Sequence, residues 1–181
     1  MNKHLKLVRE LHEAFSFPQA RHGANANLSD MDVIMRQALL MEQGSKVLKA
    51  LKAGDMVEIL TELIDLSYYA LGAIAMQGAD VIIQPVSWRH DGFVLSVMNI
   101  LSDKINDCAS GSAECYSEVY CLCELLARSF INADFDKAFQ TVHVYNISSL
   151  SESGKPINMD TGELQRSELF TVPDLSDCLY E

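Results

Sequence analysis

The chain has 181 residues, a formal net charge of -11 at pH 7 and a sequence pI near 4.8. This charge argues against a nucleic-acid partner or an anionic lipid surface, whereas a nucleotide whose phosphates are bridged by a divalent cation remains a compatible ligand. Hydrophobic residues make up 49% of the chain, with only 4 prolines and 9 glycines, which predicts a single compact, helix-rich domain over residues 1–181.

Features of secreted or membrane-embedded chains are missing from the sequence. The N-terminal segment is amphipathic and lacks the apolar run and cleavage site of a signal peptide, and we find no stretch with the ~20 apolar residues of a membrane span. The 5 cysteines are odd in number, which favours reduced thiols that pack as small hydrophobic groups. We therefore expect a cytoplasmic protein with no membrane partner.

Apolar residues recur at helical spacing through most of the chain. Ser29 can cap a helix N-terminus, and the pair Gly54-Asp55 can end one helix and begin the next. Short connections of this kind make antiparallel neighbours, so we predict an all-α antiparallel helix bundle. The predicted helices cover residues 5–15, about 31–52, 55–76, 92–106, 114–131 and a stretch that begins at 134.

The segments between and after these helices are predicted to be irregular. Residues 79–90 contain a short apolar run broken by Pro85, and a strand there would be isolated, so we predict a connection with Trp88 packed against the bundle. Residues 108–113 are typical of a loop. Residues 151–181 are polar and rich in turn signals, which indicates an arm over the bundle or over a partner subunit, with a hairpin compatible with 157–164.

The most informative stretch runs from residue 36 to residue 72. Its second helix carries Glu62 and Asp65 three residues apart, so the two carboxylates lie on one helical face and can share a cation. By itself such a pair is more often a pair of solvated surface charges.

Glu62 and Asp65 belong to a longer series of residues whose order and spacing recur in a known protein family. The residues of this series are His12 to Phe15, Leu28 to Asp30, Arg36, Leu39, Glu42, Ala50-Leu51, Gly54-Asp55, Glu62, Asp65, Tyr68, Gly72 and Gly78, then Asp134 to Phe139, Val142-His143, Asn146, Gly154 to Ile157 and Pro173 to Leu175. In order and spacing they resemble the MazG-like, all-α nucleoside triphosphate pyrophosphohydrolases, which include the phosphoribosyl-ATP pyrophosphohydrolases. The resemblance implies a core of residues 5–80 and 134–150, a helical insertion over 81–133 and a C-terminal arm over 151–181.

The resemblance also implies a metal site, with two substitutions in it. In the family, Glu-x-x-Glu on one helix and Glu-x-x-Asp on the next hold Mg²⁺ or Mn²⁺, and a water attacks between the α- and β-phosphates to give a nucleoside monophosphate and pyrophosphate. Here Glu62 and Asp65 form the second pair, but the first pair falls on Gln43 and Lys46. Gln43 offers an uncharged oxygen, and Lys46 would repel the metal and could pair with either acid.

The candidate site residues follow from this resemblance. Glu42, Gln43, Lys46, Glu62 and Asp65 occupy the catalytic positions, and Glu42 and Glu58 are candidates to replace the missing metal ligands. Asp134 and Asp136 are further carboxylates that could approach the site.

Nucleotide contacts are expected from Tyr68, Asn146 and Lys155. Core packing is nevertheless the more common role for an aromatic residue such as Tyr68, and Asn146 is equally compatible with a helix C-cap. The resemblance implies a homodimer, and the altered metal pair implies weak or absent hydrolysis. Two alternatives are a catalytically dead protein that binds a nucleotide or phosphate ligand and an oligomeric interaction protein.

Overall fold

The computed structural model describes residues 1–83, 85–89, 91–148, 163 and 173–180. This part of the chain contains six α-helices and no strand, which confirms the all-α prediction; its one isolated bridge joins Ala133 to Leu179. The helices are α1 (Lys3–Ala14), α2 (Asp30–Ala53), α3 (Met56–Gln77), α4 (Val94–Asp107), α5 (Ala113–Leu125) and α6 (Phe135–Ser148), with short helical turns η1 (Cys108–Ser110), η2 (Leu126–Phe130) and η3 (Ser176–Cys178).

The boundary between α2 and α3 follows the capping chemistry that the sequence predicts. Gly54 ends α2 in the left-handed conformation, with φ of 75°, and the Asp55 carboxylate accepts hydrogen bonds from the first backbone amides of α3 at 3.0 Å. The predicted helix over 114–131 differs, because α5 ends at Leu125 and continues as the π-helical turn η2. The amide of Ile131 donates to the carbonyl of Leu126, five residues earlier, as in a π-helix.

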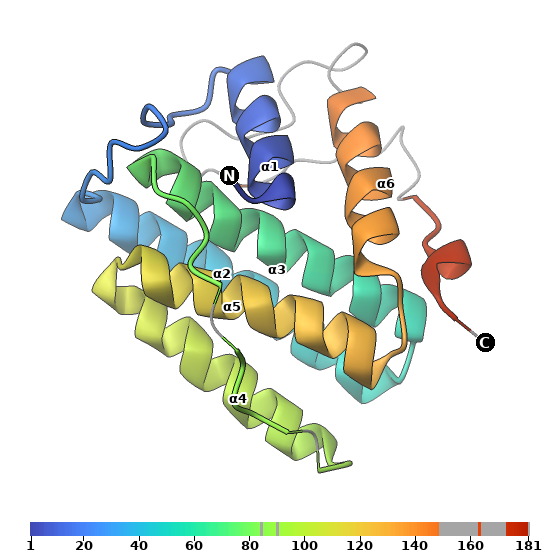
Figure 1. Cartoon of the computed structure of the whole chain (residues 1–181). Coiled ribbons are helices and arrows are strands. Elements are labelled where there is room, and N and C mark those ends of the chain that lie inside the picture. The colour runs from blue at the N-terminus through green and yellow to red at the C-terminus, as the bar shows by residue number, and fades with distance from the viewer. Residues whose placement is uncertain (84, 90, 149–162, 164–172, 181) are drawn as a thin grey trace.

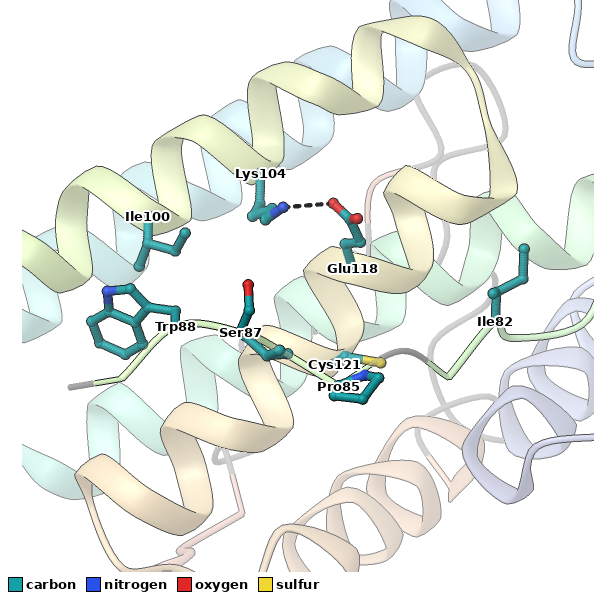
Figure 2. Close-up of a pocket in the computed structure, with 9 residues that line it drawn as sticks. Ile82, Pro85, Ser87, Trp88, Ile100, Lys104, Glu118 and Cys121 are labelled. Carbon is teal, nitrogen blue, oxygen red and sulfur yellow. Dashed lines mark hydrogen bonds and ion pairs between the residues drawn. The ribbon is translucent and has the colours of Figure 1, made fainter.

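Residues 79–83 and 85–89 form the irregular connection between α3 and α4 that the sequence predicts. The segment passes over α5 (Figure 1), and its Trp88 lies beside Ile100 of α4 (Figure 2). Trp88 is half-buried and packs against the hydrophobic core, as expected. The loop predicted over 108–113 is shorter than expected, because its first three residues form η1.

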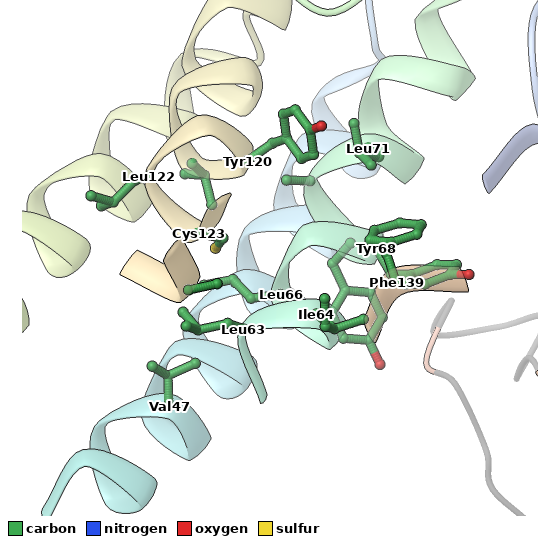
Figure 3. Packing of buried hydrophobic residues seen from close by; sticks show 14 of the residues in the cluster. Val47, Leu63, Ile64, Leu66, Tyr68, Leu71, Tyr120, Leu122, Cys123 and Phe139 are labelled. Atoms are coloured by element: carbon green, nitrogen blue, oxygen red, sulfur yellow. The ribbon is translucent and has the colours of Figure 1, made fainter. Parts of the chain in front are cut away.

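Helix α3 is the centre of the bundle and packs against α1, α2, α5 and α6. Its side chains are buried on nearly every face, among them Leu63 and Leu66, which lie against α2 and α5 (Figure 3). By length and composition alone α3 could cross a membrane, so the expectation that no segment qualifies was wrong. However, 89% of its most apolar window is buried inside the protein, as in the core helix of a helix bundle.

The described end of the C-terminal arm lies against the start of α6. The amide of Asp134 donates to the carbonyl of Cys178 at 2.7 Å, and the amide of Tyr180 donates to that of Asn132 at 2.9 Å. Leu175 is fully buried, which anchors this end of the arm to the core. The hairpin predicted over 157–164 falls outside the described residues, apart from Glu163. All five cysteines are free thiols.

Candidate functional site

The structure brings two of the predicted site residues into direct contact across the α2–α3 interface. The side chain of Gln43 is buried, with 2% exposure, and its Nε2 donates to the Glu62 carboxylate Oε2 at 2.5 Å and to the Glu62 carbonyl at 3.1 Å. Both protons of the amide therefore have acceptors on one residue. The Glu62 carboxylate, which the family motif assigns to the metal, is here held by an amide group.

Asp65 lies one turn further along α3 and is buried, with 6% exposure. Lys46 is on the exposed side of α2, and no ion pair between Lys46 and Glu62 is found in the described part of the chain. The charge of Lys46 is therefore screened by water rather than built into the site. The substitution that acts directly on Glu62 is Gln43.

The other candidate carboxylates do not complete a metal site. Glu42 and Glu58 are both exposed. Asp134 caps α6, where its Oδ1 accepts from the amide of Lys137 at 3.0 Å. Asp136 forms ion pairs with Arg128 at 3.3 Å and with Lys3. Across the described ranges, no group of three or more His, Cys, Asp or Glu side chains could hold a metal ion.

Tyr68 belongs to a chain of polar contacts that links three helices, buried at Tyr68 and His143 and exposed at Glu10. Its hydroxyl lies 3.0 Å from Nδ1 of His143 on α6, and Nε2 of the same ring lies 3.5 Å from a carboxylate oxygen of Glu10 on α1. The Tyr68 ring stacks on Phe139, with centroids 4.6 Å apart and an interplanar angle of 7°. Burial lowers the pKa of His143, and the nearby Glu10 carboxylate opposes that shift.

This arrangement favours the structural interpretation of Tyr68, because one face of its ring is covered by Phe139. Asn146 is buried inside α6, so it does not form the helix C-cap that was one of its two expected roles. Lys155 falls outside the described residues. The sequence did not reveal the contact between Tyr68 and His143, because 75 positions separate them along the chain.

A second feature that the sequence did not reveal is a buried cation between α2 and α3. Arg36 is 2% exposed, and its Nη2 has no hydrogen-bond partner in the described structure. Its Nε donates to Sδ of Met76 at 3.2 Å, and its guanidinium carbon lies 5.2 Å from the centre of the Phe17 ring. Burial lowers the pKa of Arg36 to about 10.

The residues present do not fit a Mg²⁺ clamp of the family type. Mg²⁺ requires near-octahedral oxygen ligands and is usually balanced by carboxylates. Of the four positions that the family motif assigns to the metal, Glu62 and Asp65 are the two that carry carboxylates here, and one oxygen of Glu62 already accepts a hydrogen bond from Gln43. The site therefore has an amide–carboxylate pair where the family motif has paired carboxylates.

Comparisons with known proteins support the resemblance seen in the sequence. Residues 8–83 match the phosphoribosyl-ATP pyrophosphohydrolase family, and this range includes all of α2 and α3. The search of curated proteins and the search of solved structures each found no match. Members of the matched family generally use a divalent metal. Over residues 8–83 the chain is therefore similar to a family that belongs to the MazG-like, all-α nucleoside triphosphate pyrophosphohydrolase superfamily.

Proposed function

We propose that the chain is a pyrophosphohydrolase-type protein whose conversion of a nucleoside triphosphate into a monophosphate and pyrophosphate is weak or absent. The family match over residues 8–83 supports the class. The observation that carries the loss of activity is the 2.5 Å hydrogen bond from Gln43 Nε2 to Glu62 Oε2. A metal ion bound through Oε2 would have to displace this bond and leave one proton of a buried amide without its acceptor, while the other proton keeps the Glu62 carbonyl.

The reverse substitution gives a direct test. In Gln43→Glu, a second carboxylate would face Glu62 at hydrogen-bonding distance, and two such groups need either a shared proton or a cation. We expect Gln43→Glu/Lys46→Glu to unfold at a lower temperature than the unmodified protein without metal, and to regain stability when Mg²⁺ or Mn²⁺ is added. At a free metal concentration of about 100 times the Kd, binding would add about 2.7 kcal/mol to the free energy of unfolding.

The matched control is Asn25→Asp/Lys49→Glu. It makes the same change in net charge at two exposed positions away from the α2–α3 interface. Calorimetric titration should detect metal binding to the first double variant and neither to the control nor to the unmodified chain. Pyrophosphate release from a panel of nucleoside triphosphates should then be measured on all three proteins. Tight Mg²⁺ binding together with rapid pyrophosphate release by the unmodified chain would contradict the proposal.

The hydrogen-bonded Gln43–Glu62 pair is also compatible with the second candidate function, which is nucleotide or phosphate-ligand binding without turnover. An amide that satisfies Glu62 removes the need for a cation, so the helix pair remains stable without metal. Stabilisation of the unmodified chain by a nucleoside monophosphate or triphosphate in the absence of metal, with no pyrophosphate released, is the expected signature.

We further propose that the protein assembles as a homodimer through the outer face of α2. Met31, Ile34 and Met41 recur there at helical spacing and are 71%, 61% and 56% exposed. Large apolar side chains grouped on one exposed helix face are typical of an interaction surface. A second copy of α2 would match this face with equivalent apolar residues.

A further inference from the structure

A pocket lies between the connection that precedes α4 and the two helices α4 and α5. Its volume is about 170 Å³. Most of its lining lies outside the range 8–83 that matches the family. The residues that line it are Ile82, Pro85, Val86, Ser87, Trp88, Ile100, Lys104, Glu118 and Cys121.

The two ends of this pocket differ in chemistry. At one end the Trp88 indole lies beside Ile100 (Figure 2), and with Val86 these side chains offer an apolar surface. Further along, Nζ of Lys104 contacts a carboxylate oxygen of Glu118 at 2.8 Å. The hydroxyl of Ser87 points toward this ion pair (Figure 2).

The ion pair remains accessible from the pocket. The side chains of Lys104 and Glu118 are 27% and 30% exposed, so each is partly desolvated yet retains a face that a ligand could contact. Both charges are fixed in place, because the two side chains come from different helices that pack together. The hydrogen bond to Glu118 raises the pKa of Lys104, which keeps the ammonium charged.

These features restrict the ligands that fit. A simple anion would be attracted by Lys104 and repelled by Glu118, and a simple cation would meet the reverse combination. A molecule that carries an ammonium and a carboxylate on neighbouring atoms can pair with both side chains at once. The whole pocket, at about 170 Å³, is close in volume to a cavity of about 150 Å³ that is known to bind benzene, so it has room for one ring.

We propose that this pocket binds a small zwitterion with one apolar ring or branched chain, of the α-amino-acid class. The apolar group packs on Trp88 and Ile100, the ligand carboxylate pairs with Lys104, and its ammonium pairs with Glu118. This proposal is independent of any nucleotide chemistry at the α2–α3 interface, because it uses none of the residues there.

Trp88 provides the measurement, because it is the only tryptophan in the chain. The intrinsic fluorescence of the unmodified protein is titrated with L-phenylalanine, and then with phenethylamine and phenylacetate, each of which lacks one of the two charges. We expect a saturable change with phenylalanine and a loss of roughly tenfold or more in affinity for each of the other two. Equal affinity for all three compounds, or no saturable change with phenylalanine, would overturn the proposal.

Substitutions then locate the binding. Lys104→Met and Glu118→Gln should each weaken phenylalanine binding by roughly tenfold or more. Lys52→Met and Glu13→Gln make the same changes at exposed positions and should have no effect. The far-ultraviolet circular dichroism of each variant shows whether it has folded, and the ligand series on the unmodified chain tests the proposal even where a variant does not.

A neighbouring hollow provides a competing outcome. It also borders Trp88 and is lined by Arg89, Leu125, Leu126, Ser129 and Phe130. A ligand bound there would alter the same fluorescence but would not need Lys104 or Glu118. Phenylalanine binding that survives both substitutions would therefore refute the site proposed here.

Discussion

Replacing Arg36 with methionine should make the protein more stable, although this residue is one of the largest buried side chains. The guanidinium is 2% exposed, and the described residues place no carboxylate in an ion pair with it. Its Nη1 packs closely against Gly72 of α3, where an added Cβ would lie 3.0 Å from it and would require a small shift. Arg36→Met retains an unbranched side chain of similar length and removes the buried charge.

The magnitude follows from the lowered pKa. Burial lowers the pKa of Arg36 to about 10, well below the ordinary value of a guanidinium, and at about 1.4 kcal/mol per pH unit this corresponds to roughly 3 kcal/mol against the charged folded state at neutral pH. The substitution also removes the stacking of the guanidinium over Phe17, which contributes about 1 kcal/mol. The net gain should be about 1–2 kcal/mol, within the range for apolar replacement of buried charges.

Urea denaturation followed by circular dichroism measures this difference in unfolding free energy. The comparison requires that the slope of unfolding free energy against urea concentration is the same in both proteins. The control is Arg9→Met. Arg9 donates from Nη2 to the carbonyl of Ala20 at 2.9 Å and from Nη1 to that of Ala75 at 3.4 Å, so its loss should destabilise the fold by about 1–3 kcal/mol. If Arg36→Met destabilised the protein as much as Arg9→Met does, the reasoning about an uncompensated charge would be refuted.

Three further outcomes can be tested on the same protein. Tyr68→Phe should lower the free energy of unfolding by about 1 kcal/mol, as measured with urea, because it removes the hydroxyl contact to His143. Burial holds the pKa of His12 at about 3 against 6.5 when unfolded, so the unfolded chain binds the proton more tightly and stability should fall as the pH drops from about 6.5 toward 3; His12→Gln should flatten that dependence in acid titrations. Ile34→Glu should convert a dimer into a monomer by light scattering, whereas Lys6→Glu on α1 should not, and a monomeric unmodified chain would contradict the proposed assembly.

The helices could be predicted from the sequence because their signals are local. Gly54, Asp55 and Gly78 act on their immediate neighbours, and the apolar spacing of α1 and α4 identifies which of their faces are buried. The end of α5 could not be predicted, because a π-helical turn preserves the apolar pattern while changing the hydrogen-bond partner. The expectation that no segment could span a membrane was wrong for α3 for a related reason. Composition alone does not distinguish a helix buried in protein from one buried in lipid.

The candidate site was predicted less completely, because its chemistry depends on contacts across helices. The family spacing identified Gln43 and Glu62, but only the fold shows that the amide donates both to the carboxylate and to the backbone carbonyl. The spacing also gave Lys46 the same weight as Gln43, although Lys46 lies on the exposed side of α2. Long-range partners such as Glu10 and His143 leave no pattern in a single sequence.

The difference between these two substitutions decides how the site should be restored. Water screens the charge at Lys46, so Lys46→Glu alone should have only a small effect on metal affinity. Gln43 is 2% exposed and donates directly to Glu62, so Gln43→Glu alone should account for most of the metal binding gained by the double variant. Calorimetric titration of the two single variants with Mg²⁺ separates the contributions. If Lys46→Glu alone restored binding, the site would depend on long-range charge, and the hydrogen bond between Gln43 and Glu62 would not be what excludes the metal.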